Sequence, residues 1–209
     1  PKVFKLAEGF KFTEGPVWHP DGYLLFSDPN TNTIYRYNPK NHNVTVYMSH
    51  SGYTGADIGE YGQPGSNGLA IDKEGRLIID QHGNRRVIRI EKKGPVTILA
   101  DQIDGRRFNS PNDIVLKNDG TIYFTDPPYG LPGFFNDPKK ELDYQGVFMI
   151  KNGKVQVVSE DLGGPNGLAF SPDEKYLYVT NWDIRDIHHT KTLWRYEVQP
   201  DGVLKNGKV

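Results

Sequence analysis

Cysteine is absent from the 209-residue sequence, and the formal net charge is only −1. Without cysteine the chain has no disulfide framework, no thiolate zinc site and no cysteine nucleophile, and it is compatible with an oxidising or a reducing compartment. A charge this close to zero gives no electrostatic footprint for nucleic acid or for an anionic membrane. No apolar run reaches the roughly 18 residues of a membrane-spanning helix. We therefore expect no nucleic-acid and no membrane partner, and we favour a soluble periplasmic protein over a cytoplasmic one.

Aromatic residues are plentiful, at 12% of the chain, and charged residues stay at 24%. Disordered segments show the opposite composition, with few aromatic residues and a large net charge. The composition therefore predicts a folded chain.

One pattern recurs four times along the sequence. Each copy has a polar residue, a short apolar run, a turn with Asp or Glu beside Gly or Lys, and a strand rich in Ile, Leu, Tyr and Phe. The copies are EGPVWHPDGYLLFSD (14–28), NGLAIDKEGRLIIDQ (67–81), NDIVLKNDGTIYFTD (112–126) and NGLAFSPDEKYLYVTN (166–181). We predict a third strand after each copy, at 34–37, 87–90, 147–150 and 193–196, and a fourth after the first three, at 44–47, 96–99 and 155–158. Four antiparallel strands per repeat are typical of a β-propeller blade.

We interpret residues 1–209 as a single all-β domain, a β-propeller of four-stranded antiparallel blades. Residues 2–7 read as an outer strand that completes the last blade. The segment VLKNGKV (203–209) reads as the start of the fourth copy's own outer strand, so a four-bladed ring would have two candidates for one place. We therefore expect a six-bladed propeller with about four blades present here and the C-terminal part missing.

The connections between strands differ at the two ends of the blades. At one end they are short turns, whereas at the other they are long and irregular. Long loops gathered on one face of a rigid scaffold are where binding sites are built. We predict the site among the connections 49–66, 101–111, 127–145 and 182–192.

A polar residue begins each of the four copies on this loop side: Glu14, Asn67, Asn112 and Asn166. An Asn before Gly often serves only a left-handed turn, but Asn112 precedes Asp, and Glu14 has no such preference. A buried carboxylate needs a partner or a metal. Carboxylate and amide oxygens are hard ligands that suit Ca²⁺ or Mg²⁺, and we expect one divalent cation near the axis.

Six stretches of the chain resemble the gluconolactonase branch of the family that includes senescence marker protein (regucalcin). They are TEGPVW (13–18), SNGLAID (66–72), QHGNRRV (81–87), RFNSPNDIV (107–115), FTDPPYG (124–130) and PNGLAFSPDEKYLYV (165–179). The resemblance implies a six-bladed propeller that binds one divalent cation on its axis and hydrolyses lactones. Calcium is the first choice of ion, with Zn²⁺, Mn²⁺, Mg²⁺ and Fe²⁺ as alternatives.

By this resemblance Glu14 and Asn166 match metal ligands, and Asn112 matches the Asn that lies beside the metal and contacts substrate or bound water. We assign all three to the metal, and Asn112 also to substrate. The catalytic groups would be Glu14 and a carboxylate from a later blade. That carboxylate, the family's remaining ligand, has no counterpart in this sequence, so the activity of the chain by itself is in question.

Four further assignments concern the rim of the site. Asn67, His82, Arg107 and Tyr129 are candidates for binding substrate. A structural role for His82 and a surface ion pair for Arg107 are equal alternatives. Trp18 is expected in the core, and Trp182 at the mouth of the pocket.

Three functions remain open. The first is a metal-dependent hydrolase that opens a small sugar lactone such as gluconolactone, by polarisation of the carbonyl and attack of water. The second is a phosphotriesterase that acts on organophosphates with the same axial metal. The third is a calcium-binding propeller without enzymatic activity. In each case the protein would be a monomer or a homodimer.

Overall fold

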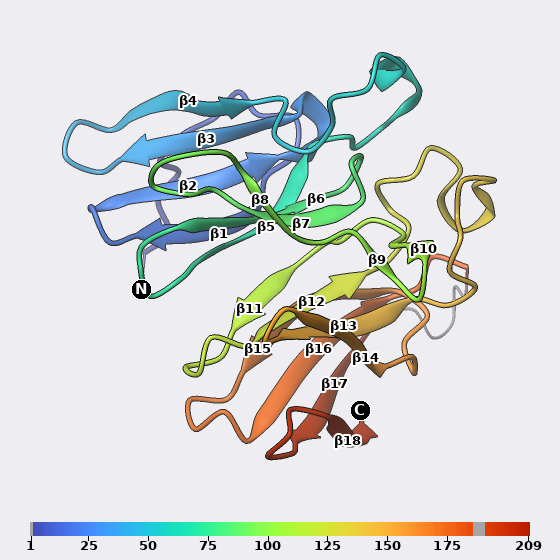
Figure 1. Cartoon of the computed structure of the whole chain (residues 1–209). Helices are drawn as coiled ribbons and strands as arrows, with labels where there is room; N and C mark the ends of the chain where they lie inside the picture. Colours follow the sequence, from blue (N-terminus) through green and yellow to red (C-terminus); the bar gives the residue numbers. More distant parts are fainter. Residues whose placement is uncertain (1, 186–190) are drawn as a thin grey trace.

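The computed structural model describes residues 2–185 and 191–209 and is built on four four-stranded antiparallel sheets (Figure 1). The first sheet contains β1 (Glu14–His19), β2 (Tyr23–Asp28), β3 (Thr33–Asn38) and β4 (Asn43–Ser49). The second contains β5 (Ser66–Ile71), β6 (Leu77–Gln81), β7 (Arg86–Arg89) and β8 (Thr97–Ala100). The third contains β11 (Ile114–Leu116), β12 (Ile122–Asp126), β13 (Gly146–Lys151) and β14 (Lys154–Ser159). The fourth contains β15 (Pro165–Phe170), β16 (Tyr176–Trp182), β17 (Lys191–Val198) and β18 (Leu204–Lys208).

Each sheet is one copy of the repeat, with its strands side by side in sequence order. All the predicted third and fourth strands are present, and the outer strand expected after residue 203 is β18. The only helical segments of the described residues are three short 3₁₀ turns, at Pro29–Thr31, Ile58–Glu60 and Phe134–Asn136. The chain is therefore all-β and propeller-like, as the repeat predicts.

The sheets are arranged like the blades of a fan, with β1, β5, β11 and β15 along its inner side (Figure 1). Because side chains alternate between the two faces of a strand, each blade presents an apolar face to each neighbour. In β6, Ile79 packs toward the first blade and Ile78 toward the third. In β12, Phe124 packs toward the second blade and Tyr123 toward the fourth. The core thus consists of three apolar layers between four blades.

The two blades at the ends of the fan each have one face without a neighbouring blade among the described residues. Trp18 and Val46 of the first blade are 56% and 59% exposed, and Leu193 of the fourth is 54% exposed. The prediction that Trp18 lies in the core is therefore wrong, because no further blade covers its side of β1.

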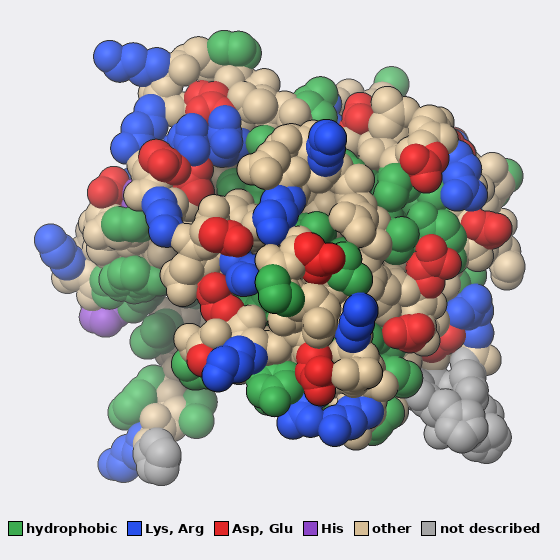
Figure 2. All heavy atoms as spheres, turned by 60° about the horizontal axis from the view of Figure 1, so that its bottom comes forward, with side chains coloured by type: hydrophobic (Ala, Val, Ile, Leu, Met, Phe, Trp, Pro, Cys, Tyr) green, Lys and Arg blue, Asp and Glu red, His purple; other side chains and the backbone are tan. Residues whose placement is uncertain are grey.

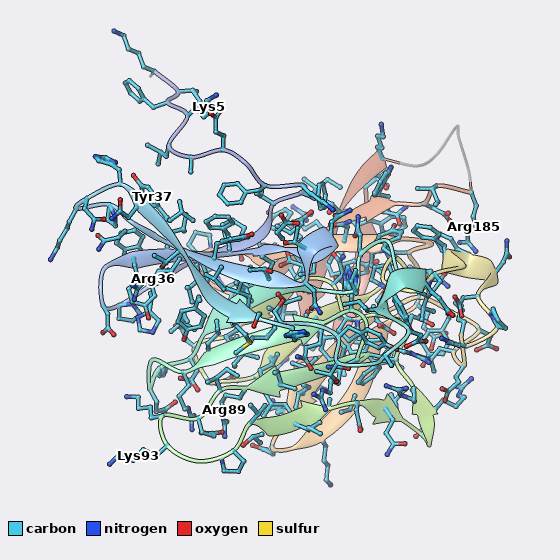
Figure 3. The ribbon with its side chains drawn as sticks, turned by 90° about the horizontal axis from the view of Figure 1, so that it is seen from above. Lys5, Arg36, Tyr37, Arg89, Lys93 and Arg185 are labelled. Atoms are coloured by element: carbon cyan, nitrogen blue, oxygen red, sulfur yellow. The ribbon has the colours of Figure 1, made fainter. Side chains whose placement is uncertain are left out.

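Residues 2–7 form no strand here, and the segment around Lys5 extends away from the blades (Figure 3). Val3 and Phe4 are 98% and 73% exposed. The fourth blade has β18 as its outer strand, so this segment has no blade to complete among the described residues. Its pairing with a last blade stays a prediction.

A small hairpin of β9 (Gln102–Ile103) and β10 (Arg106–Arg107) lies in the connection 101–111, which was predicted to be irregular. Its two turn residues are Asp104 and Gly105, both with positive φ. Asp-Gly is the residue pair that a tight hairpin turn prefers, so the signal was present in the sequence.

The surface mixes charges of both signs. On the face in Figure 2, Lys and Arg side chains alternate with Asp and Glu, and no large area carries one sign. None of the described helices is long and apolar enough to cross a membrane.

Candidate functional site

The innermost strands are irregular at the positions of the predicted axial residues. In β1 the register shifts between Glu14 and Val17, in β5 between Ser66 and Leu69, and in β15 between Pro165 and Leu168. In the third blade the regular strand begins only at Ile114, after Asn112. Such irregularities bend a strand and redirect its side chains. A register shift therefore recurs at three of the four polar residues, and the fourth, Asn112, lies just before its regular strand.

The glycine after the polar residue allows neighbouring blades to approach closely. A Cβ atom on Gly15 would lie 2.1 Å from the Asn67 carbonyl oxygen, and one on Gly68 would lie 2.7 Å from Asp113 Cα. The Gly68 N–H donates to the Asn112 carbonyl at 2.6 Å. Asn67 and Asn166 are not among the residues with positive φ, so a left-handed turn does not explain these Asn-Gly pairs. At Gly15 and Gly68 the missing side chain serves the contact between blades.

This contact predicts opposite outcomes for two equivalent glycines. Gly68→Ala should lower the free energy of unfolding by about 1–3 kcal/mol, because the new methyl group overlaps the backbone of the third blade. Gly167→Ala should change it by less than about 0.5 kcal/mol, because its Cβ would meet Thr180 Oγ1 at an ordinary 3.4 Å. Neither glycine has positive φ, so the pair isolates the steric effect. Urea unfolding measures both, and equal losses would contradict the interpretation.

The four axial residues line one pocket of about 290 Å³. This volume lies near the lower end of small-molecule sites, which span roughly 300–1,000 Å³. The long loops also contribute, as predicted; Tyr129 and Trp182 were expected at the site, whereas Gln63, Phe134 and Ile184 carry no recognisable sequence signal. The lining residues are Phe12, Glu14, Gln63, Asn67, Asn112, Tyr129, Phe134, Asn166, Trp182 and Ile184.

Glu14 is the only carboxylate that lines this pocket in the described part of the chain. Burial raises the pKa of Glu14; the Gly15 backbone N–H lowers it, and the negative charge of Asp113 raises it further. A carboxylate in such surroundings is stabilised by a positive charge nearby. No Lys or Arg among the described lining residues supplies such a charge.

The three asparagine side chains of the pocket differ in their hydrogen bonds. Asn112 is 3% exposed, and its Nδ2 lies 3.1 Å from His82 Nε2. Among the described residues, the side chains of Asn67 and Asn166 have no hydrogen-bond partner, so their amide groups remain available to a ligand. Their atoms line the same pocket as Glu14. The sequence thus correctly brings these four residues together.

Tyr129 and Trp182 form one wall of the pocket. Their ring centroids lie 5.6 Å apart, and the Tyr129 hydroxyl donates to the Trp182 carbonyl. Burial raises the pKa of Tyr129, so this hydroxyl stays protonated. Trp182 is 46% exposed and lies at the pocket mouth, as predicted.

His82 lies behind the pocket rather than in its lining. Its side chain is fully buried, and burial lowers its pKa to about 4. The imidazole therefore reaches the pocket only through Asn112. Direct substrate binding by His82, one of the two alternatives, has no support in this geometry.

Arg107 lines a different pocket, of about 610 Å³, together with Tyr53, Tyr61 and Lys139. One of its guanidinium nitrogens donates to the Asn84 carbonyl at 2.7 Å. No described acidic side chain forms an ion pair with Arg107, so the predicted surface ion pair is not found, and Arg107 lies outside the axial pocket.

The donor set of the axial pocket fits a hard divalent cation, since it offers one carboxylate and three amides. Within residues 2–185 and 191–209, no cluster of three or more His, Cys, Asp or Glu side chains is placed to hold a metal ion. A cation in this pocket would therefore be held by the Glu14 carboxylate together with amide oxygens.

Residues 12–209 match the model of one protein family, the SMP-30/Gluconolactonase/LRE-like region. The chain belongs to this family. The match covers all four blades, and the resemblance drawn from the sequence motifs is confirmed.

Two relatives in the family are similar along most of the chain. A gluconolactonase of Zymomonas mobilis is 36% identical over 205 residues, which are 95% of this chain and 55% of the relative. A gluconolactonase structure from Xanthomonas campestris is 29% identical, with a TM-score of 0.78, and the match covers 97% of this chain and 63% of that one.

A third relative shows only the shared fold. The calcium-binding protein regucalcin of Agrobacterium tumefaciens is 17% identical, with a TM-score of 0.68 over 98% of this chain and 61% of that one. The chain thus spans between about half and two thirds of the length of these proteins.

Proposed function

We propose that this protein hydrolyses a small lactone, with a sugar lactone as the substrate and a divalent cation, calcium in the first place, held at the axial pocket. The observation that carries the proposal is the convergence of Glu14 with three amide side chains in one pocket. Two relatives with high coverage of this chain are gluconolactonases.

The pocket suits a small polar ring. Its volume of about 290 Å³ leaves room for one such molecule. The apolar side chains of Phe12 and Ile184 and the rings of Tyr129 and Trp182 surround it and reduce its contact with water. The amide of Asn67 is available to bind a hydroxyl or carbonyl oxygen, which gives the substrate an orientation.

The cation would be held by Glu14, Asn112 and Asn166. When bound, a divalent cation polarises a lactone carbonyl and stabilises the negative charge that develops on its oxygen. Glu14 supplies the negative charge that keeps the ion in place, and Asn112 and Asn166 supply neutral oxygens. Asn67 is left to contact substrate.

We also propose that the functional ring has six blades. Support comes from the exposed apolar side chains on the end blades, including Trp18 and Leu193. Burying such side chains stabilises a protein by about 25 cal/mol per Å² of apolar surface, and further blades would cover them. In the six-bladed ring residues 2–7 would join the last blade.

The test compares two substrate classes on the full chain, before and after removal of metal with a chelator. We expect an aldonolactone to be hydrolysed, the activity to disappear on chelation, and calcium or another divalent ion to restore it. A pH-stat measures lactone opening, and release of nitrophenol measures phosphotriester hydrolysis in parallel.

Hydrolysis of the phosphotriester alone would replace the lactonase proposal with the phosphotriesterase one. Stoichiometric calcium binding without either activity would favour a binding propeller. Lactone hydrolysis that is insensitive to chelation would contradict the role of the cation.

A further inference from the structure

His82 connects the two long loops of the site to Asn112. Its backbone N–H donates to the Gly65 carbonyl at 3.2 Å, in the loop before β5. Its imidazole packs against Gly130, in the loop after β12: a Cβ atom on Gly130 would lie 2.4 Å from His82 Cβ and 2.7 Å from Cγ. The ring is therefore held in one position between the two loops.

Asn112 is fixed by its backbone as well. Its N–H donates to the Thr125 carbonyl at 2.8 Å, and its carbonyl accepts from Gly68 N–H at 2.6 Å. The remaining freedom is the rotation of the carboxamide, which decides whether oxygen or nitrogen faces the pocket. Of the four axial side chains, Asn112 is the one whose amide is hydrogen-bonded to another described side chain.

We propose that His82 is a positioning residue that orients the Asn112 carboxamide, so that Asn112 Oδ1 faces the cation in the axial pocket. This inference rests on the proposed function, because it assigns the oxygen to a bound cation. It differs from a substrate-binding or proton-transfer role, since the imidazole never contacts substrate.

The chemistry of the two groups sets the direction of the hydrogen bond. Asn112 Nδ2 carries only hydrogens to donate, and it lies 3.1 Å from His82 Nε2. A neutral imidazole has one N–H and one nitrogen that accepts. Because Nδ2 can only donate, Nε2 accepts from it in the neutral ring. The ring proton then resides on Nδ1, which has no hydrogen-bond partner among the described residues.

The consequence concerns the cation. With Nδ2 engaged by His82, the opposite atom of the amide, Oδ1, is left for the pocket. If the amide were free to rotate, its NH₂ group would face the cation for part of the time, and that orientation repels a positive charge. Residues that orient a metal ligand in this way typically change metal affinity by about 10–100-fold when they are removed.

The test measures calcium binding to the metal-free full chain by calorimetry, in two variants of His82. His82→Met keeps the volume and removes the acceptor, and we expect it to weaken calcium binding by about tenfold or more. His82→Gln places a carbonyl oxygen near the former Nε2, and we expect affinity within about threefold of the parent. Thermal unfolding of both metal-free variants checks that they fold alike.

A third variant acts on the ring without changing a hydrogen-bonding group. Gly130→Ala adds a methyl group that displaces the imidazole, and we expect it to weaken calcium binding as His82→Met does. This variant keeps the inference testable if His82→Met does not fold.

Parent-like affinity in His82→Met, or a loss in His82→Gln as large as in His82→Met, would overturn the positioning role. Failure of the proposed function gives other results. If the parent protein binds no calcium, the calcium site itself is refuted. If the parent binds calcium with the expected dependence on residue 82 but hydrolyses no lactone, only the lactonase proposal fails.

Discussion

The Glu14→Gln variant is expected to lose both its cation and its activity. Glutamine keeps the shape of the side chain but removes the only carboxylate of the described pocket lining. We expect calcium affinity to fall by at least about 100-fold, because loss of a residue that only orients a metal ligand already costs about 10–100-fold. Lactone hydrolysis at fixed calcium should fall by about 10²–10³-fold, as when one group that stabilises the developing oxyanion is lost. Calorimetry and kcat/KM measure the two effects.

The same substitution should act in the opposite direction on the metal-free fold. Burial and the charge of Asp113 both disfavour ionised Glu14. Removing this charge is therefore expected to leave the free energy of unfolding unchanged or to raise it slightly. A lower stability of the metal-free variant would indicate that Glu14 has a structural partner.

Glu8→Gln is a suitable control, because Glu8 is an exposed carboxylate that pairs only with Lys5 at the described surface. It should change neither calcium affinity nor hydrolysis. Activity of Glu14→Gln within about threefold of the parent would refute the assignment of the axial pocket.

The Phe124→Ala variant should show the largest loss of stability. Phe124 is fully buried between the second and third blades. Its ring meets Phe108 edge-on at 5.1 Å and stacks on Phe148 at 5.3 Å. Removal of such a ring leaves a cavity in a close-packed layer, and we expect the free energy of unfolding to fall by about 3–5 kcal/mol. Urea unfolding measures the loss.

Phe4→Ala is the matched control, since Phe4 is 73% exposed in the N-terminal segment. Its expected change is within about 0.5 kcal/mol. A loss below 1 kcal/mol in Phe124→Ala would mean that the layer between these blades contributes little to stability. That result would be inconsistent with a propeller-like core.

Much of the fold follows from the sequence because the repeat is local. Each copy carries its own turns and its own alternation of apolar residues, so the strands of each sheet can be read directly. The alternation also explains the layers between blades, since Ile78 and Ile79 must face opposite neighbours. The prediction for Trp18 was wrong because an alternating pattern shows on which face of the strand a side chain lies, but not whether another blade covers that face.

Some residues of the site could likewise be predicted from the sequence, and others could not. The sequence determined which residues meet in one pocket, because equivalent positions of a repeat occupy equivalent places, and Glu14, Asn67, Asn112 and Asn166 share its lining. It could not place His82 behind Asn112 or Arg107 in a separate pocket. Those positions depend on how two long loops pack across blades, and loop packing follows from contacts between residues far apart in the chain. The repeat depends on residues that are close together in the sequence. The contacts of a loop residue, by contrast, form only when the blades pack against one another.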